Sequence, residues 1–536
     1  MELERSKLLL ESVQNGDVEE LRNLMDTEEA DEFDEEFEEE FLMSSAVKIS
    51  DNNHRSRKLR YRRFKTIFSI PDPVTGVIET PDPRKSSWYT CYVKFPQRGV
   101  TNFENTFKNR FRLSYNMFEA LMHLAKESDC GKKYFQRWLR TGDATGQKSP
   151  IELLVLGSLR YLGRGWTFDD LQENTQISRE LHRQFFHVFI AFGSTSLYNK
   201  FVTLPTETNM KNHFEVKQKA GHPACAGFSD ATNIVCEKVE HALKNSHTGY
   251  KQSTTARTYN LTVTIEKRII NSTSGHPARW NDQSVSYFDN YIMSIKEGKL
   301  FNDHDFKLLE RNLNGEIVEV KYKGVYLLVD NGYHKWVSLI PPMKVASKRS
   351  DVRWSMWVES LRKVVECTFG IMKGRFRILK AGVRLHGVEA ADKIWLTCCA
   401  LHNWLLDETS TGTDQWDGVR GLFSEEDVWR HIINTPLARI QNAPTMRDLR
   451  ELQRYDSTST GREGDTFSIE EVDEGRYNDE NTLISNCGRV RIVRNLSFEF
   501  FRSRLIENFH IRFIERKDIF WPSGKKYMRC HQPTLL

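Results

Sequence analysis

The chain lacks the usual features of secreted and membrane proteins. Its nine cysteines are an odd number and include no Cys-x-x-Cys pair, which argues against a disulfide scaffold and against a thiolate zinc site. The N-terminal residues contain no signal-peptide core, and no apolar run reaches the ~20 residues that span a bilayer. We therefore expect a soluble, intracellular protein without a membrane partner.

The chain also has little net charge and no internal repeat. Lys and Arg number 77 against 73 Asp and Glu, yet the charges are segregated. Acidic residues crowd 26–41, and basic residues crowd 55–65 and 489–529. Segregated basic blocks indicate a polyanionic partner. At 536 residues the chain is too long for a single core, so about three domains are expected.

Residues 1–100 are predicted to be largely disordered. The acidic block, interrupted by Phe33, Phe37 and Phe41, cannot bury enough surface to fold alone, so we expect a solvated linker or a helix that forms on a partner. The first basic block fits a nuclear import signal, a phosphate-binding arm or a plain solvated segment. The import interpretation predicts a nuclear location, with the cytoplasm as the alternative.

Residues 101–205 are predicted to form a helical domain. Thr167 and Asp170 have the spacing of a capping box, and Ser178 begins a longer helix. A short helix, a tight turn and a longer helix outline a helix-turn-helix, although an ordinary hairpin in a helical bundle has the same pattern. In a helix-turn-helix the residues expected to contact duplex DNA lie at the start of the longer helix: Arg179, His182, Arg183 and Gln184.

Residues 220–408 are predicted to form a mixed α/β domain, with a mixed sheet flanked by helices. Alternating and β-branched residues indicate a hairpin of strands at 259–265 and 269–273, and an apolar run indicates a further strand at 322–329. Strands followed by helices that pack on them favour this fold class. The helices are expected at 353–373 and 388–407.

The C-terminal part of the chain is divided into two predicted regions. Residues 409–485 are polar and are expected to form a loop region with one helix near 425–433. Residues 486–536 form a basic segment interleaved with aromatic residues. Rings among bases can stack on nucleotides, which predicts a nucleic-acid-binding tail, but a small helix packed on the body explains the same pattern.

Three acids lie at positions suited to hard cations. Asp230 follows the run 225–229, Asp330 follows the apolar run 325–329, and Glu366 lies inside a basic helical stretch. Carboxylates at two strand tips and on a helix can hold two Mg²⁺ or Mn²⁺ ions ~3.5–4 Å apart, which clamp the attacking and leaving oxygens of a phosphodiester. The pattern predicts a two-metal polynucleotidyl transferase that acts on double-stranded DNA.

Two other acids compete for these positions. Glu359 lies two turns before Glu366 on a similar helix face and competes for the helix position. Asp282 competes for the second acid, but it follows a turn region instead of an apolar strand, so Asp330 is preferred. Taken singly, each acid fits a surface carboxylate better than a ligand. The order of the three acids is what indicates metal chemistry.

Basic residues surround the helix acid. We expect them to hold DNA on either side of the reacting phosphate, although a solvated helix face has the same composition. A weaker group of the same kind, His247, Lys251 and Arg257, falls between the first two predicted strands. The stronger group comprises Lys363, Lys373, Arg375, Arg377 and Lys380.

Several short stretches carry a family resemblance. They are Ser229-Asp230-Ala231-Thr232, Arg257-Thr258-Tyr259-Asn260, Gly275-His276-Pro277 through Asn281-Asp282, Val329-Asp330-Asn331-Gly332-Tyr333, Val365-Glu366-Cys367-Thr368-Phe369-Gly370 and Ala400-Leu401-His402-Asn403. In them the chain resembles Harbinger-type transposases of the DDE superfamily, in the group of plant transposon proteins and DDE endonucleases. The resemblance implies an RNase H-like catalytic fold, a preceding helix-turn-helix and divalent metal.

The resemblance also carries expectations about the site and its reaction. The family's three acids correspond to Asp230, Asp330 and Glu366. The implied reaction cuts transposon ends and transfers the 3′-hydroxyl to target DNA. A separate Myb-like protein is implied as a partner in DNA binding and nuclear entry, and a homo-oligomer is a further expected state, which the sequence does not fix.

The chain departs from the resemblance at Asn233. The family commonly has Asp-x-Thr-His after the first strand, and Asn cannot take up a proton near neutral pH. On a continuing strand Asn233 would project to the face opposite Asp230, whereas a turn would bring it back beside the metal site. This departure keeps open a second hypothesis, a domesticated DNA-binding protein without catalysis.

Overall fold

The computed structural model describes residues 81–139, 149–249, 254–344, 348–409, 498–523 and 526–529. Contacts divide the chain into the units Met1–Asp82 and Pro83–Leu536, and almost every described residue belongs to the second. The predicted acidic block, the first basic block and the polar loop region, with its helix near 425–433, lie outside the described residues. Among the described helices, none combines the length and the apolar character that crossing a bilayer requires.

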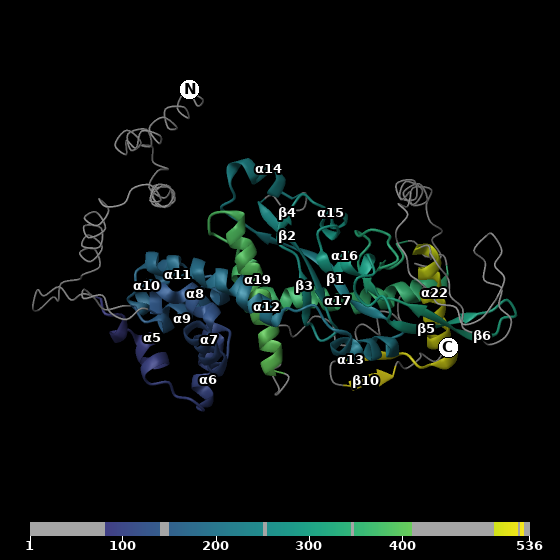
Figure 1. Ribbon diagram of the computed structural model, residues 1–536, viewed down its shortest axis with the longest axis horizontal. Helices are drawn as coiled ribbons and strands as arrows, with labels where there is room; N and C mark the ends of the chain where they lie inside the picture. The colour runs from purple at the N-terminus through teal and green to yellow at the C-terminus, as the bar shows by residue number, and fades with distance from the viewer. Residues whose placement is uncertain are drawn as a thin grey trace, which may run out of the picture. The chain divides into compact units, whose positions relative to one another are not determined.

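The region predicted to be helical consists of helices (Figure 1). They pack through aromatic side chains. The apolar helix α9 is buried along most of its length and ends at Gly165, whose positive φ of 66° suits a glycine. The helices are α5 (Ser87–Tyr89), α6 (Thr101–Phe111), α7 (Tyr115–Glu127), α8 (Asp129–Leu139), α9 (Ile151–Arg164), α10 (Phe168–Thr175), α11 (Arg179–Phe192), α12 (Tyr198–Phe201) and α13 (Glu207–Lys219).

The turn between α10 and α11 confirms the predicted caps and corrects one expected contact. The capping box between Thr167 and Asp170 is present, and Ser178 caps α11. His182, expected beside DNA, is buried instead, and its Nε2 lies 2.8 Å from Thr175 Oγ1 across the turn. Burial lowers the pKa of His182 to about 3, so this histidine is a neutral residue that joins the two helices.

A mixed sheet forms the centre of the predicted α/β domain. Its strand order is β3-β2-β1-β7-β8, with β4 paired to β2. Strands β1, β2 and β3 are antiparallel neighbours, which confirms the predicted hairpin, and β1, β7 and β8 are parallel. The strands are β1 (Cys225–Val235), β2 (Ala256–Val263), β3 (Ile269–Ser272), β4 (His276–Pro277), β7 (Tyr326–Leu328) and β8 (Leu339–Ile340).

The single strand predicted at 322–329 is wrong, because the segment belongs to two sheets. β6 (Ile317–Lys323) pairs with β5 (Asp305–Arg311) in a separate hairpin, and β7 joins the central sheet. Gly324 lies between them with a φ of 103°, which redirects the chain. Apolar character could not reveal this break, since Tyr322 and Tyr326 on its two sides are both fully buried.

Helices flank the central sheet, as the sequence predicts. α17 (Arg349–Arg375) and α19 (Val388–Thr409) cover one face, where Trp395 stacks on Tyr259 of β2 with ring centroids 4.8 Å apart. Asn260 points to the other face and donates to Asp289, which caps α16 (Asn290–Lys296). The predicted mixed sheet with flanking helices is therefore confirmed.

The basic C-terminal segment contains a packed helix, α22 (Phe498–His510). Asn508 of this helix accepts a hydrogen bond of 3.0 Å from the backbone of Leu309, and the ring of Phe501 packs on Tyr326. The aromatic residues Phe498, Phe501 and Phe509 are buried, so they do not offer stacking surfaces to a nucleic acid. For this helix the alternative interpretation, a helix packed on the body, replaces the predicted tail.

Candidate active site

The parallel pairing of β1 with β7 brings two of the predicted acids together. Phe228 of β1 is the partner of Leu328 of β7, so Asp230 and Asp330, each two residues further along, reach the same level of the sheet. Asp330 lies just beyond β7 in a turn, and its Oδ1 accepts a 2.7 Å hydrogen bond from the Gly332 amide. Asp230 lies inside β1 and not at its tip, which corrects the predicted placement.

The surroundings of Asp230 disfavour its negative charge. Its side chain is only 16% exposed. Burial raises the pKa of Asp230 to about 6, the Arg362 guanidinium opposes this shift, and the charges of Asp330 and Asp282 add to it. The four groups therefore lie within electrostatic reach of one another.

Arg362 connects the strand acids to the helix acid. Its Nη1 lies 2.8 Å from Asp230 Oδ2, and its Nη2 lies 2.9 Å from Glu366 Oε1, one helical turn further along α17. Burial opposes the charge of Arg362, but Asp230, Glu366 and Asp330 together raise its pKa. A single guanidinium thus bridges Asp230 and Glu366 beside Asp330, and all three predicted acids meet at one place.

Asp282 is a fourth carboxylate at this site. It is the first residue of α15 (Asp282–Ser286), and its Oδ2 would lie 2.3 Å from a Cβ placed on Gly332. Asp330 Oδ1 would lie 3.0 Å from the same Cβ, so only glycine fits between the two carboxylates. Asp282, predicted as a competitor of Asp330, therefore adjoins it. The helix competitor Glu359 is exposed, and Arg362 links Glu366, not Glu359, to Asp230.

The donor atoms of the site suit a hard divalent cation. Carboxylate oxygens are the ligands that Mg²⁺ and Mn²⁺ prefer, and Asp230 carries a charge that burial and neighbouring acids disfavour. In the described part of the chain, no three acidic, histidine or cysteine side chains already lie in a metal-binding arrangement. The Arg362 guanidinium lies between Asp230 and Glu366. The residues fit such a cation in chemistry, with Arg362 as the competing positive charge.

Asn233 faces away from the acids. β1 and β2 pair without interruption from Phe228 to Val235, so successive side chains alternate between the two faces of the sheet. Asn233 lies three residues after Asp230 and accepts a 2.7 Å hydrogen bond from Thr258 on the opposite face. The sequence difference at this position therefore does not touch the acid cluster.

The predicted basic residues near Glu366 differ in whether their side chains reach the surface. Lys373 Nζ donates to Thr232 Oγ1 over 2.8 Å, which places it on the Asp230 face of β1, and burial lowers the pKa of Lys373. Lys363 is half-buried, and Arg377 is exposed. Arg375 is buried beside His402, with Nη1 3.3 Å from His402 Nδ1, so its predicted contact with DNA is wrong.

The two arginines predicted to contact DNA lie at the start of α11, away from the helical core. Arg179 is exposed, and Arg183 forms an ion pair of 2.9 Å with Glu180 and is 26% exposed. Neither arginine is buried, so both can reach a ligand on this surface. The helix-turn-helix assignment stays a prediction.

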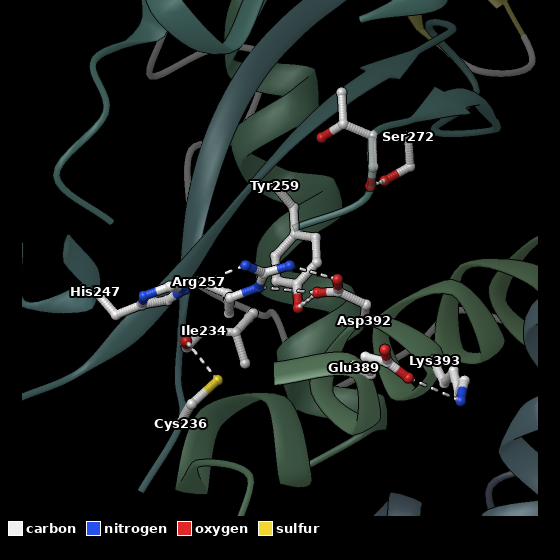
Figure 2. Close-up of polar contacts among 10 residues, drawn as sticks. Ile234, Cys236, His247, Arg257, Tyr259, Ser272, Glu389, Asp392 and Lys393 are labelled. Atoms are coloured by element: carbon white, nitrogen blue, oxygen red, sulfur yellow. Dashed lines mark hydrogen bonds and ion pairs between the residues drawn. The ribbon is translucent and has the colours of Figure 1, made fainter. Parts of the chain in front are cut away.

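A second polar cluster, which the sequence did not reveal, fixes α19 to the sheet (Figure 2). Asp392 accepts hydrogen bonds from Arg257 and from the Tyr259 hydroxyl, the latter over 2.8 Å. His247 Nδ1 donates to the Leu243 carbonyl, so its Nε2 accepts from Arg257 over 3.1 Å. Arg257 and His247 are therefore engaged inside the protein, and their predicted contact with DNA is wrong.

The groups that sequence reasoning missed differ in how well they could have been found. Arg362 precedes Glu366 by four residues, which is the spacing of a helical ion pair, so this link was open to prediction. The partners Arg257 and Asp392 lie 135 positions apart, and no spacing rule connects them.

Comparison with known families supports the geometry. Residues 229–403 match the DDE superfamily endonuclease family. This range begins one residue before Asp230 and includes Asp330 and Glu366. The chain carries a DDE superfamily endonuclease domain. The domain thus coincides with the central sheet, α17 and most of α19.

Two curated relatives match part of the chain. The protein named "Putative nuclease HARBI1" in Bos taurus is 28% identical over 130 residues, which is 23% of this chain and 36% of the relative. Its counterpart of the same name in Homo sapiens is 28% identical over 111 residues, 20% of this chain and 31% of the relative. The matches thus span about a third of each relative's length. No solved structure matches the chain.

Proposed function

We propose that the protein is a DDE-type nuclease that cuts DNA by two-metal chemistry, as a Harbinger-type transposase does at transposon ends, and joins the 3′-hydroxyl to target DNA. The observation that carries the proposal is the bridge from Asp230 through Arg362 to Glu366, at the level where Asp330 also ends its strand. The endonuclease domain match over the same residues supports it.

Each group at the site would have a defined part in the reaction. Asp230, Asp330 and Glu366 would hold divalent cations, with Asp282 as a fourth carboxylate. Such cations supply the charge that stabilises the attacking and leaving oxygens of a phosphodiester. Arg362 balances the acids when no cation is bound. Lys373, which lies on the Asp230 face of β1, would hold a DNA phosphate next to the acids.

The remaining parts of the proposal concern partners. Double-stranded DNA would bind along α11 through Arg179 and Arg183, and beside α17 through Lys363 and Arg377. A Myb-like protein would assist DNA binding, the protein would act in the nucleus, and a homo-oligomer would hold two DNA ends together. The RNase H-like description of the fold belongs to the same proposal, which the strand order β3-β2-β1-β7-β8 supports.

The test is cleavage of DNA that carries the terminal repeats flanking the gene, with Mg²⁺ or Mn²⁺. Asp330→Asn is expected to abolish cleavage and to keep or strengthen DNA binding, because one negative charge near the phosphates is removed. Glu359→Gln, an exposed acid on the same helix as Glu366, is the control and should cut like the wild type. Wild-type cleavage rates in Asp330→Asn would show that Asp330 is not a ligand.

A DNA-binding protein without catalysis is the second candidate. Asn233 no longer argues for it, because its side chain lies on the face opposite the acids. Arg362 is the observation that favours it, since its guanidinium already forms ion pairs with Asp230 and Glu366. A folded wild-type protein that binds terminal-repeat DNA but does not cut it with either cation would establish this second function.

A further inference from the structure

Exposed aromatic side chains gather around α15, the helix that begins at Asp282. In the part of the chain that the structure describes, four aromatic side chains are strongly exposed, and three of them are Trp280, Tyr287 and Phe288 at 37%, 53% and 57%. The fourth is Phe95, in the N-terminal helical region. Rings of this size are normally buried, and an exposed group of them marks an interaction surface.

The first cluster consists of His276, Trp280 and Phe288. His276 stacks on Trp280 with ring centroids 5.3 Å apart and planes 13° apart, and Phe288 contacts Trp280 at 5.0 Å. His276 Nε2 is shielded from solvent, so this ring backs Trp280 from inside. A flat, partly exposed ring surface is suited to the face of a planar ligand.

The second cluster consists of Tyr287, His334 and Trp336, of which Tyr287 is exposed and Trp336 is buried. His334 stacks on Trp336 with centroids 4.6 Å apart and planes 8° apart, and Tyr287 meets both rings edge-on. The ammonium of Lys296 lies 3.9 Å from the centre of the Trp336 ring. His334 and Lys296 thus cover the Trp336 ring, and Tyr287 presents the exposed ring of this cluster.

Both clusters are close in sequence to acids of the candidate site. Trp280 stands two residues before Asp282, with only the α15 cap Asn281 between them. His334 stands four residues after Asp330, in the segment that leads to β8. Two to four residues of chain span little more than ~13 Å, so an extended ligand that rests on these rings can reach the carboxylates that would hold the reacting phosphodiester.

We propose that the exposed rings of the two clusters, Trp280, Phe288 and Tyr287, form a stacking site for unpaired bases of the DNA strand that is cut. The inference rests on the proposed nuclease function. Aromatic faces accept any base, whereas a protein partner would require a wider apolar surface than these three rings. Bases that leave the duplex at the cleavage position would stack here, and the phosphate between them would face the acids.

The probe is DNA with an unpaired thymine end that contains 2-aminopurine, compared with the same DNA fully paired. Binding is measured with the full chain in EDTA, so that no cleavage step enters. Trp280→Leu combined with Phe288→Ala is expected to weaken binding of the unpaired end about tenfold and to remove the quenching of 2-aminopurine, since stacking contributes ~1–3 kcal/mol per base. Leucine keeps the apolar character of the site but has no ring face.

The control variant is Phe95→Ala, which removes an exposed ring outside the endonuclease domain and should leave binding and quenching unchanged. The fully paired DNA should bind the double variant as it binds the wild type. Equal weakening for both DNAs, no weakening at all, or a change of oligomeric state in the double variant would overturn the stacking site. Cleavage by the wild type is scored separately, so failure of the nuclease proposal leaves a distinct result from failure of stacking.

Discussion

The carboxyl group of Asp230 carries a charge that its surroundings disfavour. Burial among Asp330 and Asp282 disfavours its charge, and Arg362 only partly compensates. A divalent cation would replace that partial compensation with two positive charges. The fold therefore holds an electrostatically unfavourable carboxylate at the position where a cation would bind.

This charge predicts a dependence of stability on pH. The pKa of Asp230 is about 6 in the folded protein and near 3.8 when unfolded, so the folded state binds more protons between these values. Its contribution favours folding below pH 4 and is lost as the pH rises through 6, by about 3 kcal/mol. Asp230→Asn should therefore unfold at a higher temperature than wild type at pH 7 in EDTA.

The same difference should vanish near pH 4, where both side chains are neutral. Calorimetric melting of wild type and Asp230→Asn across this pH range checks the expectation. A stability advantage of the variant that is equal at pH 4 and pH 7 would mean that the Asp230 charge is not the cause.

At the scale of elements, strand β1 decides which side chains reach the acids. Its uninterrupted pairing sends Asp230 and Thr232 to the α17 face and Asn233 to the other. The spacing of residues in a sequence motif does not reveal this alternation when a turn is an equally good continuation. Whether Asn233 can affect the acids thus depends on the face of β1 on which its side chain lies, and not on its distance from Asp230 along the chain.

Strand alternation makes a paired prediction. Asn233→His should leave the cleavage rate within about twofold of wild type, as expected of a change of roughly ±0.5 kcal/mol. Thr232→Val should lower cleavage, because it removes the acceptor that holds Lys373 beside the acids. Single-turnover cleavage of terminal-repeat DNA measures both, and a large effect of Asn233→His with none from Thr232→Val would contradict the assignment of faces.

The start of α11 offers a second element-scale test. Replacing Arg179 and Arg183 by Ala should weaken duplex DNA binding and flatten its dependence on salt, since each lost phosphate contact reduces counterion release by ~0.9 ion. Lys132→Ala with Lys133→Ala removes the same charge from exposed positions on α8 and should change the slope little. If DNA binding by the two double variants depended equally on salt concentration, α11 would have only a structural role.

At the scale of the whole molecule, α19 joins parts of the chain that are distant in sequence. Asp392 at its start binds Arg257 and Tyr259 of β2, and Thr397 donates to the Ile190 carbonyl at the end of α11. α19 therefore contacts both the helical region and the central sheet of the endonuclease domain. Disturbing its contacts should destabilise the fold without touching the acids.

Two glycines test this role. A Cβ at Gly275 would lie 2.2 Å from Asp392 Oδ1, so Gly275→Ala should destabilise the protein by about 1–3 kcal/mol. A Cβ at Gly370 of α17 meets nothing within 4 Å, so Gly370→Ala should be neutral or stabilise by ~0.5–1 kcal/mol. Urea unfolding measures both, and equal stability of the two variants would rule out a constraint at Gly275.

The sequence by itself determined the element types, the caps of α10 and α11 and the three acids, because each depends on local periodicity or short spacing. The tertiary structure alone decided the break at Gly324, the burial of His182 and Arg375, and the internal pairing of Arg257 with Asp392. The tertiary structure also places the Asp282 carboxylate beside that of Asp330. Each of these outcomes depends on how separate elements pack, and the pairing of Arg257 with Asp392 joins residues 135 positions apart, which no local pattern connects.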